Sequence, residues 1–210
     1  MLQQALKFFV VFFVVVEPVS LIPLFTGLTA GADRAYKRRM ALRSVSIAAA
    51  ILLLFALGGA AFLRLMGISL EAFRIFGGLL LFLLALEMVF ARESGARTSS
   101  SEAAESRRRA DISVFPLAFP FIAGPGTLAT ILLWFGPLRL GTNTALFSAY
   151  LVAAMLVLAI ALVLMLLADP LMRVIGVTGA NVAGRLAGVI LGALAVQYVL
   201  DGVRRAFGVS

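Results

Sequence analysis

Long apolar stretches separated by short polar segments run along almost the whole chain. Six of these stretches are long enough to cross a bilayer, since a membrane-spanning helix needs about 20 residues. The pattern therefore predicts an all-α polytopic membrane protein, in which helices satisfy the backbone polar groups internally. The predicted transmembrane helices cover residues 6–28, 43–66, 70–90, 113–138, 145–168 and 180–203.

Residues 92–111 are the one clear hydrophilic segment between the predicted helices, and they leave three helices on each side. The segment is rich in Ser, Ala, Glu and Arg, which is typical of a solvated loop. We therefore expect a first three-helix repeat over residues 1–91, a cytoplasmic linker over 92–111 and a second three-helix repeat over 112–210.

Short matches recur in the same order in both halves and indicate a duplication. Pro18 and Pro23 correspond to Pro120 and Pro125. A repeat with an odd number of transmembrane helices enters the membrane the second time from the opposite face, so the sequence predicts two inverted repeats. Two further matches pair residues 64–69 with 173–178, and 74–77 with 185–188.

The two proline pairs lie inside apolar stretches and predict that helices 1 and 4 are broken. A proline removes a backbone donor and frees the carbonyl four residues back. In hydrocarbon an unsatisfied carbonyl costs several kcal/mol, so broken backbone is tolerated only where it is buried in protein or lines a cavity. Two such breaks in corresponding positions point to the central site of a transporter. They cover residues 17–23 and 119–127.

Glu17 is the one acidic residue deep inside a predicted helix, about ten residues from its start, whereas the other acids lie at or near helix ends or in the linker. A carboxylate at that depth is costly unless it is neutral, paired or hydrated. Two interpretations follow. Glu17, with Ser20 and the carbonyls freed by Pro18 and Pro23, binds a cation or an ammonium group. Alternatively, a protonated Glu17 only satisfies those carbonyls.

In the second half Phe119 stands in the place of Glu17, and the break continues as Gly124-Pro125-Gly126-Thr127. Proline is favoured at the first position of a helix, and glycine lets the backbone approach a ligand closely. We predict a half-helix whose free amides bind a carboxylate, unless the segment is a plain kink. Thr127 and Thr130 add hydroxyl donors. An anion site facing a cation site suits a zwitterion such as an amino acid.

Three further polar residues lie in the predicted helices. Arg74 and Arg185 either snorkel to the interface or reach the broken segments as pairing or gating residues. Asn181 is a weaker candidate of the same kind, because such residues more often form hydrogen bonds between helices. Glycine and alanine recur every fourth residue over 176–192, a stripe that allows close packing inside the protein or in a homo-oligomer.

Composition and charge agree with a membrane location. The chain is 62% hydrophobic and 13% charged, whereas a soluble domain is about half apolar and about a quarter charged. Eleven Lys and Arg residues lie in the loops after predicted helices 1, 3 and 5, and five lie on the other side. The positive-inside rule makes the first side cytoplasmic, which predicts that both termini lie on the extracytoplasmic side of the inner membrane. No basic folded domain is predicted, so nucleic acid is not an expected partner.

The chain contains no cysteine and no histidine, so it has no disulfide and no thiolate metal site, and proton chemistry would use carboxylates. It also has no zinc-protease motif, nucleophile elbow or phosphate-binding loop. We therefore expect neither enzymatic activity nor a cofactor.

The run from Asp111 to Thr127 closely resembles the signature of the MarC family of integral membrane proteins. Segments 17–25 and 74–81 resemble two further patterns of that family. The resemblance covers essentially the whole chain and implies a bacterial or archaeal protein with six transmembrane helices. The family includes members that are described as small neutral amino acid transporters. This chain has Glu17 where the family more usually has aspartate or asparagine.

Together the residues and the resemblance predict a secondary transporter. A small neutral amino acid such as glycine or alanine would bind between the breaks, with Glu17 holding its ammonium group or a coupling proton or sodium ion. The two repeats would rock about this site to give alternating access. The alternatives are a channel or facilitator for small solutes, and a non-transporting membrane scaffold.

Overall fold

The computed structural model describes residues 1–90, 111–138 and 141–208, and these segments are almost entirely helical. No strand occurs within these ranges. The elements in chain order are α1 (Leu2–Val16), α2 (Leu21–Leu28), α3 (Arg34–Leu65), α4 (Leu70–Phe90), η1 (Ser113–Ile122), α6 (Pro125–Phe135), α7 (Thr144–Leu166) and α8 (Ala168–Phe207).

The all-α membrane fold predicted from the sequence is confirmed. Five helical segments are long and apolar enough to cross a bilayer, and η1 with α6 forms a sixth candidate that bends by 55°. The third predicted helix matches α4 at both ends. The second begins at Arg34 rather than at residue 43, because Asp33 caps the helix by accepting a hydrogen bond from the Tyr36 backbone at 2.7 Å.

The last helix also begins earlier than predicted. α8 starts at Ala168 and contains a sharp bend at Gly176, whose φ of 65° and ψ of 173° are not helical. Glycine adopts this positive φ without a steric penalty. The part beyond the bend, Thr178–Phe207, is the candidate transmembrane segment.

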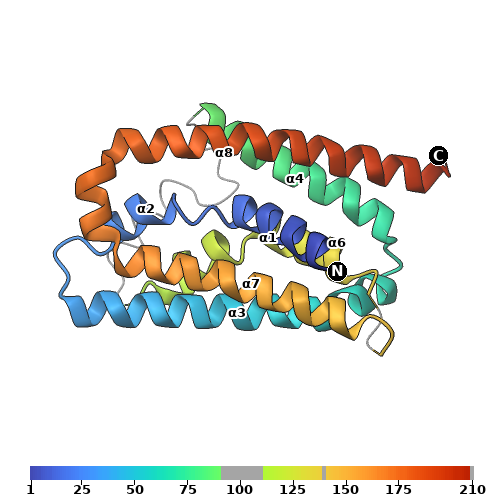
Figure 1. The fold of residues 1–210 in the computed structure, drawn as a ribbon, viewed down its shortest axis with the longest axis horizontal. Coiled ribbons are helices and arrows are strands. Elements are labelled where there is room, and N and C mark those ends of the chain that lie inside the picture. The colour runs from blue at the N-terminus through green and yellow to red at the C-terminus, as the bar shows by residue number, and fades with distance from the viewer. Residues whose placement is uncertain (91–110, 139–140, 209–210) are drawn as a thin grey trace.

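The two broken segments lie in the middle of the molecule (Figure 1). α4 and α8 pack side by side along one face, and α3 and α7 run along the opposite face. α1, α2, η1 and α6 contact helices of these two layers. Both chain termini lie toward the same end of the long axis. The interrupted backbone therefore lies inside the protein. This is the location that its N–H and C=O groups require, because they lack helical hydrogen-bond partners.

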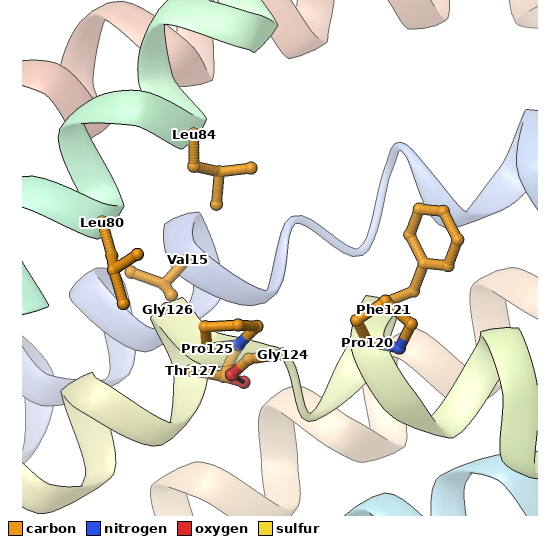
Figure 2. A pocket seen from close by; sticks show the side chains of 9 residues that line it. All are labelled: Val15, Leu80, Leu84, Pro120, Phe121, Gly124, Pro125, Gly126 and Thr127. Carbon is orange, nitrogen blue, oxygen red and sulfur yellow. Dashed lines mark hydrogen bonds between the residues drawn. The ribbon is translucent and has the colours of Figure 1, made fainter. Parts of the chain in front are cut away.

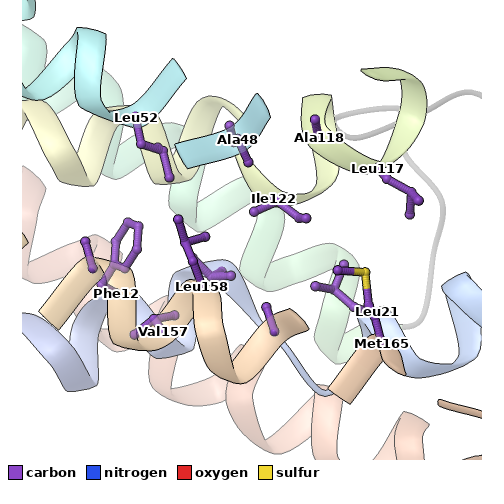
Figure 3. Close-up of a cluster of buried hydrophobic side chains, with 14 of the residues drawn as sticks. Phe12, Leu21, Ala48, Leu52, Leu117, Ala118, Ile122, Val157, Leu158 and Met165 are labelled. Carbon is purple, nitrogen blue, oxygen red and sulfur yellow. The ribbon is translucent and has the colours of Figure 1, made fainter. Parts of the chain in front are cut away.

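Two apolar clusters hold the broken segments in place. The larger one brings together side chains of α1, α3, η1 and α7, including Phe12, Leu52, Ile122 and Leu158 (Figure 3). The smaller one joins α1 and α6 to α4 and α8. A hydrogen bond of 2.8 Å, donated by the Trp134 indole to the Tyr198 hydroxyl, also links α6 to α8. The end of α1 thus packs against both layers.

Leu158→Ala should lower the free energy of unfolding by about 2–5 kcal/mol. Leu158 is 1% exposed in the larger cluster, and its truncation leaves a cavity whose lining loses dispersion contacts. The matched control is Leu156→Ala on the same helix, because Leu156 is 52% exposed and should cost less than about 0.5 kcal/mol. Reversible unfolding in mixed micelles measures both, and equal effects would contradict the packing described here.

The division into two inverted repeats stays a prediction. Both breaks fall at the proline pairs, since α1 ends just before Glu17 and η1 ends two residues before Gly124. Of the predicted linker 92–111, only Asp111 lies within the described residues.

Candidate functional site

The first break places a carboxylate inside the protein. α1 ends at Val16, and Glu17 adopts a left-handed backbone with φ 54° and ψ 57°. Such a conformation is uncommon for a residue with a side chain and costs roughly 1–3 kcal/mol. The Glu17 amide still closes the helix by donating to the Phe13 carbonyl at 3.0 Å. The residue is only 6% exposed.

Ser20 and α8 surround the Glu17 carboxylate. The Ser20 hydroxyl donates a hydrogen bond to Glu17 Oε1. α8 passes the carboxylate at Gly184, where an added Cβ would lie 3.2 Å from Glu17 Oε1 and 3.5 Å from Ser20 Oγ. The small-residue stripe of α8 therefore lets this helix approach the acid closely. Sequence reasoning had assigned this stripe to helix packing alone.

A pocket of about 250 Å³ opens beside the carboxylate. Its walls come from the end of α1, the turn into α2 and one face of α8. They consist of Phe13, Val14, Glu17, Pro18, Val19, Ser20, Ala183, Gly184, Ala187 and Ile190. The predicted residues Glu17, Pro18 and Ser20 are therefore brought together, whereas Pro23 lies within α2 and does not line this pocket.

The second break arises from two Phe-Pro steps. Phe115 and Phe119 both have extended backbones inside η1, because the ring of a following proline disfavours the helical conformation. The chain then turns at Gly124, which precedes Pro125 at the first position of α6. An added Cβ on Gly124 would lie 2.1 Å from the Pro120 carbonyl oxygen, so this close approach of backbone to backbone requires glycine.

The first amides of α6 have no acceptor within the helix. Its first helical hydrogen bond runs from the Leu128 amide to the Gly124 carbonyl at 3.0 Å. The amides of Gly126 and Thr127 precede Leu128, so no carbonyl of the helix is available to accept from them. The Thr127 hydroxyl donates to the Gly124 carbonyl at 2.8 Å, and the Thr130 hydroxyl to the Gly126 carbonyl at 2.9 Å. In this conformation both hydroxyl protons stabilise the turn.

A second pocket, of about 90 Å³, lies at this turn. Figure 2 shows Leu80 and Leu84 of α4 pointing toward the turn from one side, with Phe121 standing on the other. Glycine at 126 lets α6 pack closely against α4, since an added Cβ would lie 2.8 Å from Leu81 Cδ2. The lining residues are Val15, Leu80, Leu84, Pro120, Phe121, Gly124, Pro125, Gly126 and Thr127.

The end of α1 stands between the two pockets. Val14 lines the pocket at Glu17, whereas Val15, the next residue, lines the pocket at the start of α6. The remaining predicted polar residues are elsewhere: Arg74, Asn181 and Arg185 line neither of these two pockets, and the last two are exposed on α8. Sequence reasoning missed the apolar wall formed by Leu80 and Leu84, because their spacing on α4 resembles that of any packed helix.

Charged residues at one end of the bundle fix the entry to η1. Asp111 accepts hydrogen bonds from the Ser113 hydroxyl at 2.6 Å and the Ser113 amide at 2.9 Å, and it pairs with Arg43 at 2.6 Å. These donors, the Ser113 hydroxyl first, lower the pKa of Asp111 below its usual value. The carboxylate therefore stabilises this end at neutral pH, and the contribution is lost as the pH falls through the lowered pKa.

These features define a class: a polytopic α-helical membrane protein with two interrupted membrane-spanning segments that meet in the middle of the bundle, each beside a pocket. Comparison with known proteins gives the family. The chain belongs to the MarC family of integral membrane proteins, whose family model matches residues 2–207.

The relatives are similar over almost their whole length. A UPF0056 membrane protein of Aquifex aeolicus is 35% identical over 199 residues, which cover 94% of this chain and 91% of the relative. The UPF0056 membrane protein YhcE of Escherichia coli is 32% identical over 201 residues, covering 96% and 92%. A Methanocaldococcus jannaschii relative is 33% identical over 207 residues, covering 98% of both chains. No solved structure matches the chain.

Proposed function

We propose that this protein is a secondary transporter of small neutral amino acids, such as glycine and alanine, that works by alternating access. The proposal rests on two breaks that lie close together and favour ligands of opposite charge. One presents the buried Glu17 carboxylate, and the other presents the free amides of Gly126 and Thr127. A helix amino end attracts an anion, and a buried carboxylate attracts a cation or a proton.

The pocket at the start of α6 is the site we assign to the amino acid. The amides of Gly126 and Thr127 would receive the substrate carboxylate. Val15, Leu80 and Leu84 line the same pocket, so the substrate side chain would face apolar groups. A volume of about 90 Å³ suits a hydrogen or methyl side chain, whereas a leucine or phenylalanine side chain would collide with these residues.

Glu17 is the site we assign to a coupling proton or sodium ion. Its pocket contains the only carboxylate at the breaks within the described residues, and the Ser20 hydroxyl completes a polar pair beside it. Because Val14 and Val15 line different pockets, a movement of the end of α1 would change both sites together. This shared element offers a direct path for coupling.

Alternating access would come from movement of the α4–α8 layer relative to the α3–α7 layer. The broken segments lie between the two layers and would shift as the layers move. We propose the cytoplasmic membrane as the location. The start of α3, at Arg34, and the first part of α8, which carries Arg173, lie at the end away from both termini (Figure 1). Under the positive-inside rule that end would be cytoplasmic and the termini would lie outside. We propose transport rather than catalysis for the same pockets, and we assign the Ser20–Glu17 pair to ion binding.

A thermal-shift experiment on the purified full-length protein tests the substrate assignment. Alanine or glycine at about 100 times its dissociation constant should stabilise the folded state by about 2.7 kcal/mol, which raises the melting temperature. Leucine and ethylamine are the controls, because one is too large for the pocket and the other lacks the carboxylate. No stabilisation by any neutral amino acid, across pH and sodium concentration, would overturn the assignment.

Counterflow in proteoliposomes then distinguishes a transporter from a facilitator. Preloaded unlabelled alanine should drive transient accumulation of labelled alanine, and uptake should saturate. Flux that stays linear in concentration without counterflow would instead identify an open pore along the breaks.

A further inference from the structure

A third pocket lies at the end of the bundle away from the termini, where α2, α3, α7 and α8 meet. It has a volume of about 480 Å³, larger than either pocket at the breaks. Arg34, Lys37 and Arg38 line it from the start of α3, and Arg173 lines it from α8. Asp169 is the one carboxylate that lines it. The transport proposal makes no use of this pocket.

The positive charge of this pocket is only partly balanced. Lys37 Nζ contacts both oxygens of Asp169, at 3.0 and 2.7 Å. Within the described part of the chain, no salt bridge is recorded for Arg34, Arg38 or Arg173. Like charges four residues apart on a helix repel each other, as Arg34 and Arg38 do. An anion bound among the three arginines would offset this repulsion.

The pocket lies near the start of two transmembrane candidates. Arg34 is the first residue of the Arg34–Leu65 transmembrane candidate, and Arg173 lies shortly before Thr178–Phe207. Lipid phosphates lie at the ends of transmembrane helices, where basic residues gather.

The remaining walls of the pocket are apolar. Phe25 and Met165 line it together with Leu166 and Pro170, so a cationic rim stands next to a hydrophobic wall. A phospholipid has the same two parts: a phosphate, which arginine binds through paired hydrogen bonds, and the apolar start of its acyl chains. Inorganic phosphate could bind the arginines but would make no contact with the apolar side chains.

We propose that this pocket binds the phosphate of an anionic phospholipid from the surrounding leaflet. Arg34, Arg38 and Arg173 contact the phosphate oxygens, and Phe25 and Met165 contact the apolar part of the lipid. Basic pockets between transmembrane helices hold acidic headgroups in this manner. The bound lipid joins the start of α3 to α8 and covers α2 at Phe25, a few residues after the Glu17 break.

The test uses the delipidated full-length protein in a neutral detergent, with bound lipid counted by native mass spectrometry and the melting temperature recorded in parallel. Phosphatidylglycerol should bind and raise the melting temperature, while phosphatidylcholine, which has no net charge, should do neither. The double variant Arg38→Gln/Arg173→Gln should weaken phosphatidylglycerol binding by about tenfold or more. The double variant Arg204→Gln/Arg205→Gln removes the same charge from the other end of α8 and should bind normally.

Three results would overturn the proposal. One is equal binding of the two lipids, and another is equal loss in both double variants. The third is an equal rise in melting temperature with inorganic phosphate, which would make the site one for free phosphate. The single variant Arg38→Gln changes one exposed side chain and provides the same comparison if the double variant does not fold.

Discussion

Glu17→Gln should abolish uptake driven by a proton or sodium gradient while the protein stays folded. Glutamine has nearly the same shape, and its amide oxygen can still accept the hydrogen bond from the Ser20 hydroxyl that Glu17 Oε1 accepts now. What is lost is the negative charge and the ability to bind and release a proton or a sodium ion. The residues lining the α6 pocket are unchanged, so counterflow of labelled alanine should continue without a driving gradient.

Proteoliposomes allow both activities to be measured: driven uptake with an imposed pH or sodium gradient, and counterflow without one. Glu71→Gln is the matched control, because Glu71 lies in the first turn of α4 and lines neither pocket at the breaks. The control should retain driven uptake. Driven uptake that is unchanged in Glu17→Gln would refute the coupling role, whereas loss of both driven uptake and counterflow would place Glu17 in the substrate site itself.

Gly124→Ala should reduce transport by about 100-fold, the penalty that a misplacement of about 1 Å can impose on a binding geometry. The added Cβ would stand 2.1 Å from the Pro120 carbonyl oxygen, so the turn between η1 and α6 must open. The φ of −78° and ψ of 176° at Gly124 are open to alanine, and the effect therefore comes from the contact rather than from the backbone conformation. Opening the turn moves the amides of Gly126 and Thr127.

The same variant should lose the stabilisation by alanine in the thermal-shift experiment. Overpacking of this kind also costs about 1–3 kcal/mol of stability, so the melting temperature without ligand is recorded first. Gly27→Ala is the control, because Gly27 is exposed on α2 and an added Cβ there meets nothing within 4 Å. Normal alanine binding by Gly124→Ala would show that the α6 amides are not the carboxylate site.

The sequence predicted the elements of this fold well, because a bilayer allows few structures. Apolar length alone located α4 at both ends. The proline pairs located both breaks, since proline acts on the backbone of its own segment. Helix starts outside the apolar stretches were less predictable. Arg34 begins α3 through a local cap at Asp33, and no hydropathy pattern records such a cap.

The candidate site was predictable only in part. Glu17 and the Gly124–Thr127 turn were identified because a carboxylate or a Gly-Pro-Gly run inside an apolar stretch is locally anomalous. Gly184 was assigned to packing, and Leu80 and Leu84 were not singled out at all. Gly184 matters because it lies next to Glu17, and Leu80 and Leu84 matter because they line the pocket at the start of α6. Each of these contacts joins two different helices, and the sequence of one helix does not show which residues of another helix pack against it.

By itself, then, the sequence determined that the chain crosses a membrane as helices, that two of these helices break, and which break carries the acid. Each of these follows from the chemistry of a short segment in a medium that leaves no backbone group unsatisfied. Only the tertiary structure decided that Val14 and Val15 line different pockets, that α8 passes close to Glu17 at Gly184, and that four basic side chains share one pocket with an apolar wall. These relations depend on how helices far apart in sequence pack together, and packing is set by the fit of whole surfaces rather than by any single segment.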